Sequence, residues 1–433
     1  MKRLRSMVLG MSIFFLVWIV TDLFRDVYSG SSVENNGASF VANTAQIERG
    51  EYLARIGNCT GCHTASGGDA YAGGRAVDTP FGAIYASNLT PDKDTGIGAW
   101  SAGAFYRAMH EGRSRDGRLL YPAFPYPNTT LTTREDSDSI FAYLMNRVKP
   151  ASQANTPNTL SFPFNNQFAL AAWRALYFTR GEFRPESTQT AEWNRGAYLV
   201  QGLAHCGACH STRNALGAPV VGHAYDGAMM PGNDWYAPSL TAASEASVAD
   251  WSLAEIAAWL KDGATPRASA LGPMAEVIFQ STQYASNADL LAMAMYLKAL
   301  PSVEPSRASS APTKLITQSK SAGAGAPLYE KHCAHCHGEN GEGKAGAFPA
   351  LAGNRAATMA NVTNVISIII KGGFAPATAG NPRPHGMPPY YHLLSDTDIA
   401  LLATHIRSSW GNTGSAVTEL DMVKYRNAVK APK

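Results

Sequence analysis

The chain has 433 residues, a length typical of about two to four domains. Its 36 Lys and Arg and 33 Asp and Glu residues give a formal net charge of +3, which is too small to indicate a nucleic-acid-binding protein. Gly (39 residues) and Pro (25 residues) are frequent, which suits small helical domains whose long loops surround a flat cofactor.

The N-terminus predicts a membrane anchor. The basic segment Met1–Arg5 precedes the apolar run Met7–Val20, as in an export signal, and this run is short for a membrane span. No clear small-x-small cleavage site follows, and the run extends to Phe24 if it tolerates Asp22. We therefore favour an uncleaved signal-anchor over a cleaved leader, with residues 1–45 as anchor and polar tether. In either case the positive charges place the rest of the chain on the outer face of the membrane.

A five-residue pattern, Cys-x-x-Cys-His, occurs three times and uses all six cysteines. The three copies are Cys59-Thr-Gly-Cys62-His63, Cys206-Gly-Ala-Cys209-His210 and Cys333-Ala-His-Cys336-His337. This is the attachment signature of c-type haem, in which two thiols form thioethers with the haem vinyl groups and the histidine binds the iron. Zinc knuckles or disulfides are the alternative, but three chance histidines are improbable with only 11 His in the chain. The sequence therefore predicts a triheme cytochrome c with three covalently bound haem c, in the bacterial periplasm or an equivalent compartment.

The first two motifs lie in two copies of one module, residues 46–150 and residues 190–301. The markers that recur in the same order at matched spacings are Arg49-Gly50, Asn88-Leu-Thr90, Trp100-Ser101 and Gly112 in the first copy, and Arg195-Gly196, Ser239-Leu-Thr241, Trp251-Ser252 and Gly263 in the second. Such repetition indicates one fold used twice. We expect a helix between the Trp-Ser pair and the last Gly of each copy, and a closing amphipathic helix around Ile140–Leu144 and Leu290–Leu297.

Two segments connect the modules. Residues 151–189 carry too many aromatic side chains for a floppy linker, so we expect a strap packed over the first two haem domains. Residues 302–326 are rich in Ser, Ala, Pro and Gly, and this composition predicts a hinge linker.

The third module spans residues 327–412. We expect a Val- and Ile-rich helix at 361–371 and a last helix that begins with a capping box at Ser395–Asp398. Residues 413–433 form a C-terminal tail, for which solvation and contact with a membrane or partner surface are the alternatives. The predicted fold is thus mostly α, with three tandem cytochrome c-type haem domains behind an N-terminal hydrophobic segment.

An electron-carrying c-type haem usually takes Met as its sixth ligand, because thioether sulfur stabilises reduced iron and raises the reduction potential. Each module is expected to offer this Met in a loop rich in Pro and Gly. Met274 follows Gly272-Pro273 in the second module, and Met387 stands in Gly386-Met387-Pro388 of the third. Core packing is the alternative role of each, and the loop context favours ligation.

The first module lacks this Met. Phe124 stands where Met is expected, and Phe cannot ligate iron. Of its neighbours, Met109 is expected to pack in the core and His110 to be exposed. We therefore expect the first haem to be five-coordinate or weakly ligated, at a lower potential than the other two.

These motifs, in this order, resemble one family: the triheme cytochrome c subunits of membrane-bound periplasmic dehydrogenases of acetic acid bacteria, such as the alcohol, gluconate, fructose and aldehyde dehydrogenases. The resemblance covers about residues 46–412 and includes Thr79-Pro-Phe-Gly82, Asn88-Leu-Thr-Pro-Asp92, Thr95-Gly-Ile-Gly98, Ser114-Arg-Asp-Gly117, Glu192-Trp-Asn-Arg-Gly196 and Ser409-Trp-Gly-Asn412. It implies a subunit that takes electrons from a catalytic subunit, with which a small iron–sulfur subunit can be associated, and delivers them to ubiquinone in the cytoplasmic membrane. Carried over, the proximal ligands are His63, His210 and His337, and the distal ligands are Met274 and Met387.

The loop at Ala123-Phe124-Pro125-Tyr126 departs from the alcohol and gluconate types, which usually carry Met there, and looks more like subunits paired with molybdopterin hydroxylases. We therefore favour an aldehyde dehydrogenase of the molybdopterin/iron–sulfur type as partner. A quinoprotein alcohol dehydrogenase or a flavin-dependent sugar or gluconate dehydrogenase is the alternative. An alternative from another functional class is a haem catalyst or gas sensor that works at a first haem without a sixth ligand. The apolar N-terminus disfavours a freely diffusing shuttle, and the chain shows no substrate site of its own.

Overall fold

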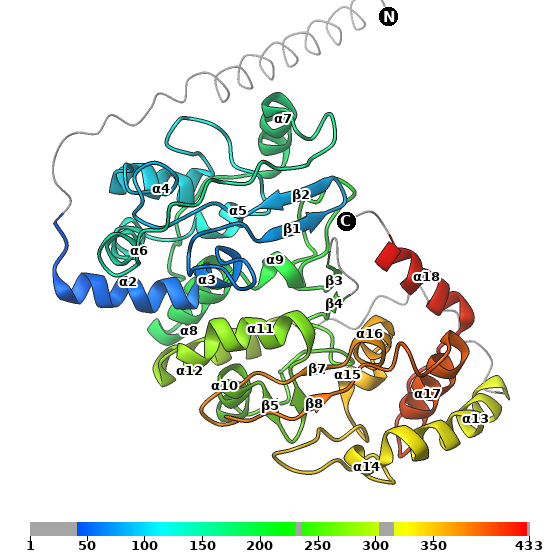
Figure 1. The fold of residues 1–433 in the computed structure, drawn as a ribbon. Helices are drawn as coiled ribbons and strands as arrows, with labels where there is room; N and C mark the ends of the chain where they lie inside the picture. Colours follow the sequence, from blue (N-terminus) through cyan, green and yellow to red (C-terminus); the bar gives the residue numbers. More distant parts are fainter. Residues whose placement is uncertain (1–40, 231–234, 303–315, 431–433) are drawn as a thin grey trace, which may run out of the picture. The chain divides into compact units, whose positions relative to one another are not determined.

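The computed structural model describes residues 41–230, 235–302 and 316–430, so the predicted signal-anchor lies outside the described residues. The described chain is mostly helical, as predicted (Figure 1). It divides into two compact units: unit 1 holds the chain up to residue 54 and residues 62–184, and unit 2 holds residues 55–61 and the chain from residue 185 on. Within these described ranges, no helix is both long enough and apolar enough to cross a membrane.

Helices dominate each part of the chain. Up to residue 184 the elements are α2 (Thr44–Ile56), α3 (Cys59–Cys62), β1 (Ala76–Thr79), β2 (Gly82–Tyr85), α4 (Ala102–Glu111), α5 (Tyr126–Thr129), α6 (Arg134–Asn146) and α7 (Gln167–Tyr177). Around the second motif they are α8 (Ala191–Ala197), the π-helix η1 (Tyr198–Leu203), α9 (Gly207–His210), β3 (Ala228–Met229), β4 (Tyr236–Ala237), α10 (Leu253–Asp262), β5 (Ala264–Thr265), β6 (Ala268–Ser269), α11 (Gly272–Gln280), the 3-10 helix η2 (Thr282–Tyr284) and α12 (Asn287–Lys298). Around the third they are α13 (Ile316–His332), α14 (Ala334–His337), α15 (Arg355–Thr358), α16 (Thr363–Lys371), β7 (Gly373–Phe374), β8 (Gly386–Met387), α17 (Asp396–Ser408) and α18 (Glu419–Lys430). The strands form four small antiparallel pairs, β1–β2, β3–β4, β5–β6 and β7–β8.

The predicted helices begin and end at the residues that the sequence marks. Ser101 caps α4, and Ser252 and Ser395 each form a capping box, with α10 and α17 respectively. Gly112 and Gly263 end α4 and α10 in the left-handed conformation, at φ angles of 60° and 68°, which suits glycine. The helices expected between the Trp-Ser pairs and these glycines are therefore confirmed.

Each motif is accompanied by a pair of helices that cross at a glycine. A Cβ atom would lie 1.8 Å from the Ser139 carbonyl oxygen at Gly50 (α2 on α6), 1.9 Å from that of Ala292 at Gly196 (α8 on α12) and 2.2 Å from that of Leu401 at Gly325 (α13 on α17). No other residue allows the two backbones to come so close. The threefold recurrence of this contact indicates that one packing arrangement is used around all three motifs.

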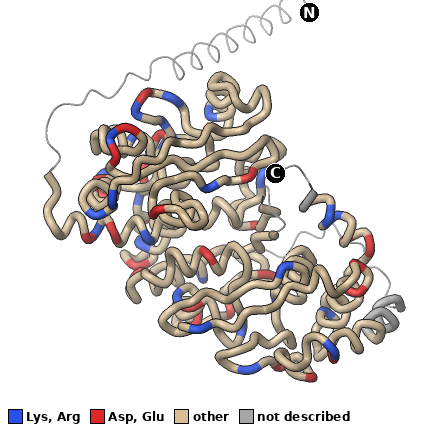
Figure 2. The backbone as a smooth tube through the Cα atoms, viewed as in Figure 1, with Lys and Arg blue, Asp and Glu red and all other residues tan. Residues whose placement is uncertain are grey.

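An ion pair reinforces two of these crossings. Arg49 bonds to Asp136, with Nη2 and Oδ1 2.5 Å apart, and Arg195 bonds to Asp289 at 2.8 Å. This explains why Arg-Gly recurs ahead of the first two motifs. Elsewhere, basic and acidic residues are interspersed along the described chain (Figure 2).

Gly325→Ala is expected to destabilise the α13–α17 packing by about 1–3 kcal/mol, because the added methyl group meets a backbone carbonyl that has little room to move. Gly323→Ala is the matched control on the same helix. A Cβ at Gly323 has no heavy atom within 4 Å. Because Ala has a higher helix propensity than Gly, this substitution is expected to be neutral or to stabilise the protein by about 0.5–1 kcal/mol. Hydrogen exchange of the α17 amides measures both effects, and equal protection in the two variants would contradict the close-contact argument.

The predicted hinge, residues 302–326, is helical over its second part. Helix α13 begins at Ile316 and ends at His332, directly before the third motif, with Pro327 inside it. Gly325 lies buried against α17, so tertiary packing overrides the linker-like composition.

The C-terminal tail also differs from the expected solvated segment. Val417, Met422 and Tyr425 are buried in the core of the third-motif region, the last two on α18. Arg407, fully buried on α17, holds the tail in place because its Nε donates to the Ser415 carbonyl at 2.8 Å. A fully solvated tail is therefore wrong, because Val417, Met422 and Tyr425 anchor it in the core.

The connector at 151–189 has backbone contacts to the segment around β2, and several of its large apolar side chains are exposed. The backbone N–H groups of Thr159 and Ser161 each donate at 2.9 Å, to the Ala83 and Phe81 carbonyls beside β2. Helix α7 buries Leu170, whereas three large apolar side chains on or near it stay exposed: Phe162 (81%), Phe168 (45%) and Leu176 (69%). Up to residue 184 the connector belongs to unit 1.

Candidate haem-binding sites

The three Cys-x-x-Cys-His motifs each fold into a short helical turn, α3, α9 and α14. None of the six cysteines, all of which the structure describes, forms a disulfide. Burial, with a smaller contribution from the second thiol of each motif, raises the pKa of Cys206 to about 12 and that of Cys333 to about 11. In this environment both thiols are neutral at physiological pH.

The three motif histidines are held in the same way. The ring Nδ1 lies 2.7 Å from the Ser87 carbonyl oxygen for His63, 2.7 Å from that of Pro238 for His210, and 2.9 Å from that of Pro349 for His337. A backbone carbonyl can only accept, so each Nδ1 must carry the proton and Nε2 is left to bind a metal. Burial lowers the pKa of all three histidines, against the opposing effect of these bonds, and so favours the neutral ring that ligates iron.

A glycine holds the backbone of each motif histidine. The N–H groups of Gly73, Gly227 and Gly343 donate at 2.8 Å to the carbonyls of His63, His210 and His337. These glycines have φ angles of 81°, 82° and 68°, where other residues are strained. Sequence reasoning missed both the glycines and the carbonyls. The signal was nevertheless present, because Ser87 and Pro238 directly precede the repeated Asn88-Leu-Thr90 and Ser239-Leu-Thr241 markers.

The structure brings Met387 close to the third motif. Met387 is half-buried and packs against the core cluster that contains Cys333. Its backbone pairs with Gly373 between β8 and β7 and lies close to Gly372, at which a Cβ atom would be 2.2 Å from the Met387 carbonyl oxygen. Met274 lies in the first turn of α11 and packs, among the described residues, with Ala275, Ile278 and Trp259, a cluster that contains no residue of the second motif.

The first site has no counterpart to these methionines. Phe124 is half-buried in its loop, and Met109 is buried in α4, the core role expected for it. The expected exposure of His110 is wrong: this side chain is 7% exposed and stacks on Tyr106, with ring centroids 4.9 Å apart. One helical turn separates the two rings, which places them on one face of α4.

The donor groups thus fit covalently attached haem. Each motif combines two thiols with a neutral histidine ring, and the third also has a methionine thioether nearby. A bound haem supplies one-electron redox chemistry at its iron. Fold and sites together define a c-type cytochrome, and the cytochrome c family profile matches residues 47–147 and 322–410.

Similar proteins indicate which kind of c-type cytochrome the chain is. The chain is 37% identical over 404 residues to the cytochrome c subunit of the quinone alcohol dehydrogenase of Gluconacetobacter polyoxogenes, covering 89% of this chain and 85% of that one. It is 35% identical to the gluconate 2-dehydrogenase cytochrome c subunit of Pantoea cypripedii, covering 89% and 90%. A nicotinate dehydrogenase subunit of Pseudomonas putida is 40% identical over 84% of this chain and 30% of that one. The chain belongs to the family of dehydrogenase cytochrome c subunits, and electron transfer is its function.

Proposed function

We propose that the chain binds three haem c, at Cys59/Cys62, Cys206/Cys209 and Cys333/Cys336, and carries electrons from a periplasmic dehydrogenase to ubiquinone in the cytoplasmic membrane. The observation that supports three haems is the threefold grip on His63, His210 and His337, each by a carbonyl at Nδ1 and a glycine N–H at the backbone. Met274 and Met387 are the proposed sixth ligands of the second and third haems.

We propose a molybdopterin/iron–sulfur dehydrogenase of the aldehyde type as the catalytic partner, with a small iron–sulfur subunit. Phe124 in place of Met and the similarity to a nicotinate dehydrogenase subunit support this choice. The similarity to alcohol and gluconate dehydrogenase subunits favours the second candidate, a quinoprotein or flavin-dependent partner. Catalysis or gas sensing at an open first haem is the candidate from another class.

Purification of the native complex from membranes tests the proposal. We expect an alkaline pyridine assay to give three haems per chain, and mass spectrometry to identify a molybdenum-containing catalytic subunit with an iron–sulfur subunit. A flavin or quinoprotein partner would overturn the choice of partner while preserving the electron-transfer role. A chain that purifies alone and turns over peroxide would instead support catalysis at the first haem.

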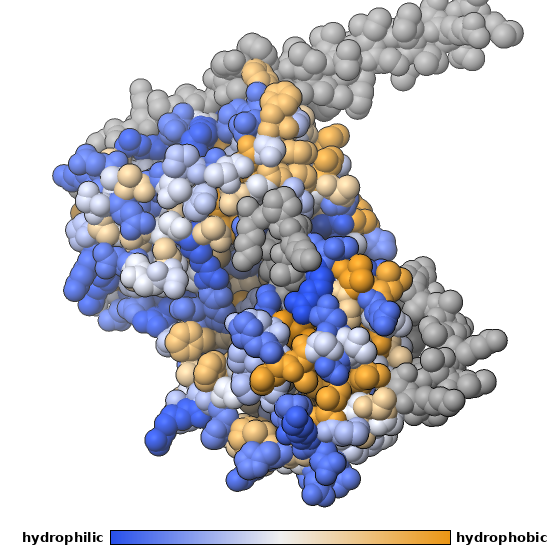
Figure 3. Space-filling model, turned by 45° about the vertical axis from the view of Figure 1, so that its right-hand side comes forward, coloured by the Kyte–Doolittle hydropathy of each residue, from blue (hydrophilic) through white to orange (hydrophobic). Residues whose placement is uncertain are grey.

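We further propose that the exposed apolar face of α7 contacts the membrane surface. Apolar residues gather over α7 at the top of the view in Figure 3. Residues 161–173 contain no charged side chain, and Trp173 and Tyr177 on the same helix lie in tilted ring contact, while Phe168 and Leu176 are exposed, a composition suited to the lipid interface.

Leu176→Glu is expected to weaken vesicle binding several-fold, because the charge would have to leave water to enter the interface. The measurement is co-sedimentation of protein lacking residues 1–40 with anionic phospholipid vesicles. Val221→Glu is the control, since Val221 is 97% exposed outside this face. Equal binding by both variants would remove α7 from the membrane contact.

A further inference from the structure

The loops that hold the second and third motif histidines also carry the contacts between the regions around these motifs. Both regions lie in unit 2, so their contacts belong to one compact body. This inference rests on the proposed function, because it concerns electron transfer between the second and third haems.

The first contact starts at His210. Gly227 and Pro238, which hold this histidine, directly flank the paired strands β3 and β4. On β4, the Tyr236 N–H donates to Oδ1 of Asn364 at 2.9 Å, and Nδ2 of Asn364 donates to the Tyr236 carbonyl at 2.8 Å. The Asn364 side-chain amide thus both accepts from and donates to the backbone of β4, the strand that precedes Pro238.

Asn364 is on α16, which belongs to the core of the third-motif region. Ile366 and Ile369 of α16 are buried in the cluster that contains Cys333 and packs against Met387. A rigid path of packed elements therefore leads from the histidine of the second motif to the core around the third.

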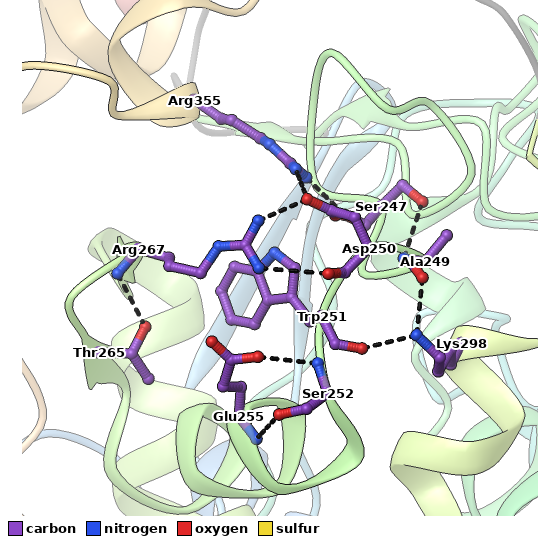
Figure 4. A network of polar contacts seen from close by, with 10 residues as sticks. All are labelled: Ser247, Ala249, Asp250, Trp251, Ser252, Glu255, Thr265, Arg267, Lys298 and Arg355. Atoms are coloured by element: carbon purple, nitrogen blue, oxygen red, sulfur yellow. Dashed lines mark hydrogen bonds and ion pairs between the residues drawn. The ribbon is translucent and has the colours of Figure 1, made fainter.

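The second contact starts at His337. Its ring is held by Pro349, and the same loop runs on to Arg355. Arg355 Nη2 donates to Asp250 at 2.6 Å and its Nη1 donates to the Ser247 carbonyl at 2.7 Å. Asp250 also accepts from Arg267, whose guanidinium lies over the Trp251 ring (Figure 4).

A cavity of about 360 Å³ lies beside this second contact. It is lined from one side by Trp251 and Arg267 and from the other by Ala350 and the segment Gly353–Arg355. The facing surfaces are not closely packed here, so the charged bridge through Asp250 is a main contact across this side.

We propose that Asn364 and Asp250 are positioning residues that fix the distance and orientation between the second and third haems. In the step they support, one electron passes from the reduced iron of one haem to the oxidised iron of the other, with no bond made or broken and no proton moved. Electron transfer falls off steeply with distance, so a displacement of about 1 Å changes its rate several-fold.

The test compares Asp250→Asn, Asn364→Ala and the double variant in the full-length holoprotein. The regions stay attached in these variants through a separate contact, in which Thr378 Oγ1 and the Gly380 N–H donate to Asp262. Asp396→Asn is the matched control. Asp396 also pairs with an arginine, Arg426, and is similarly exposed, 48% against 51% for Asp250, but this pair lies within the third-motif region.

Two readouts are measured after a haem assay: the rate of electron transfer between haems after pulse radiolysis, and the magnetic coupling between ferric haems by EPR. We expect each single variant to slow transfer several-fold and weaken the coupling, the double variant to do more, and Asp250→Glu to restore part of the loss. Wild-type rate and coupling in the double variant, at full haem content, would overturn the positioning role. Fewer than three haems in the wild-type protein would instead count against the proposed function.

Discussion

If Met387 is the sixth ligand of the third haem, as proposed, Met387→Leu is expected to change that haem from low-spin to high-spin in the oxidised protein. Leu and Met have similar volumes, and this exchange usually costs less than about 1.5 kcal/mol, so the fold is expected to persist. Loss of the thioether sulfur is expected to lower the potential of that haem by on the order of 0.1–0.3 V, within the roughly 0.8 V range that axial ligands set. EPR and a redox titration measure the two effects.

Met359→Leu is the control, because Met359 is 4% exposed in the same region and stands in no predicted ligand loop. Met274→Leu is expected to act on the second haem as Met387→Leu acts on the third, with Met293→Leu, at a site 1% exposed, as its control. An unchanged spin state in Met387→Leu or Met274→Leu would remove the affected methionine from the ligand set and return it to core packing.

The features that the sequence predicts correctly depend on residues close together in the chain. The capping box at Ser395 and Asp398 depends on two residues three positions apart. The helix before Gly112 is marked by its own capping residues, Ser101 and Gly112. The Cys-x-x-Cys-His motifs are local in the same sense. Repetition adds a second kind of evidence, because a marker that recurs must serve the shared fold.

The features that it misses depend on tertiary packing. Every residue has a carbonyl, so the sequence does not reveal that those of Ser87, Pro238 and Pro349 reach the histidine rings. The composition of residues 316–326 is that of a linker, yet they belong to α13, which packs closely on α17 at Gly325. His110 stands ten residues after Trp100, as Lys261 does after Trp251, and this match predicts exposure, but the His110 ring stacks on Tyr106 one turn away.

Phe124→Met is expected to convert the first haem from a five-coordinate or weakly ligated state to a six-coordinate, low-spin state. The sequence comparison of the two modules predicts that Phe124 corresponds to Met274 of the second. The loop is held by backbone bonds, from the Phe124 N–H to the Tyr121 carbonyl at 3.1 Å and from the Tyr126 N–H to the Phe124 carbonyl at 2.7 Å. Because these bonds do not involve the side chain, the substitution is expected to preserve the loop.

The added thioether is expected to raise the potential of the first haem and to abolish carbon monoxide binding there, since sulfur would occupy the open side of the iron. Phe124→Leu separates ligation from packing, because it removes the aromatic ring without supplying a ligand. Optical and EPR spectra of the oxidised protein, with carbon monoxide titration of the reduced protein, provide the measurement. Three low-spin haems in the wild-type protein would show that another side chain already fills this position, and would remove the structural basis for catalysis or gas sensing at the first haem.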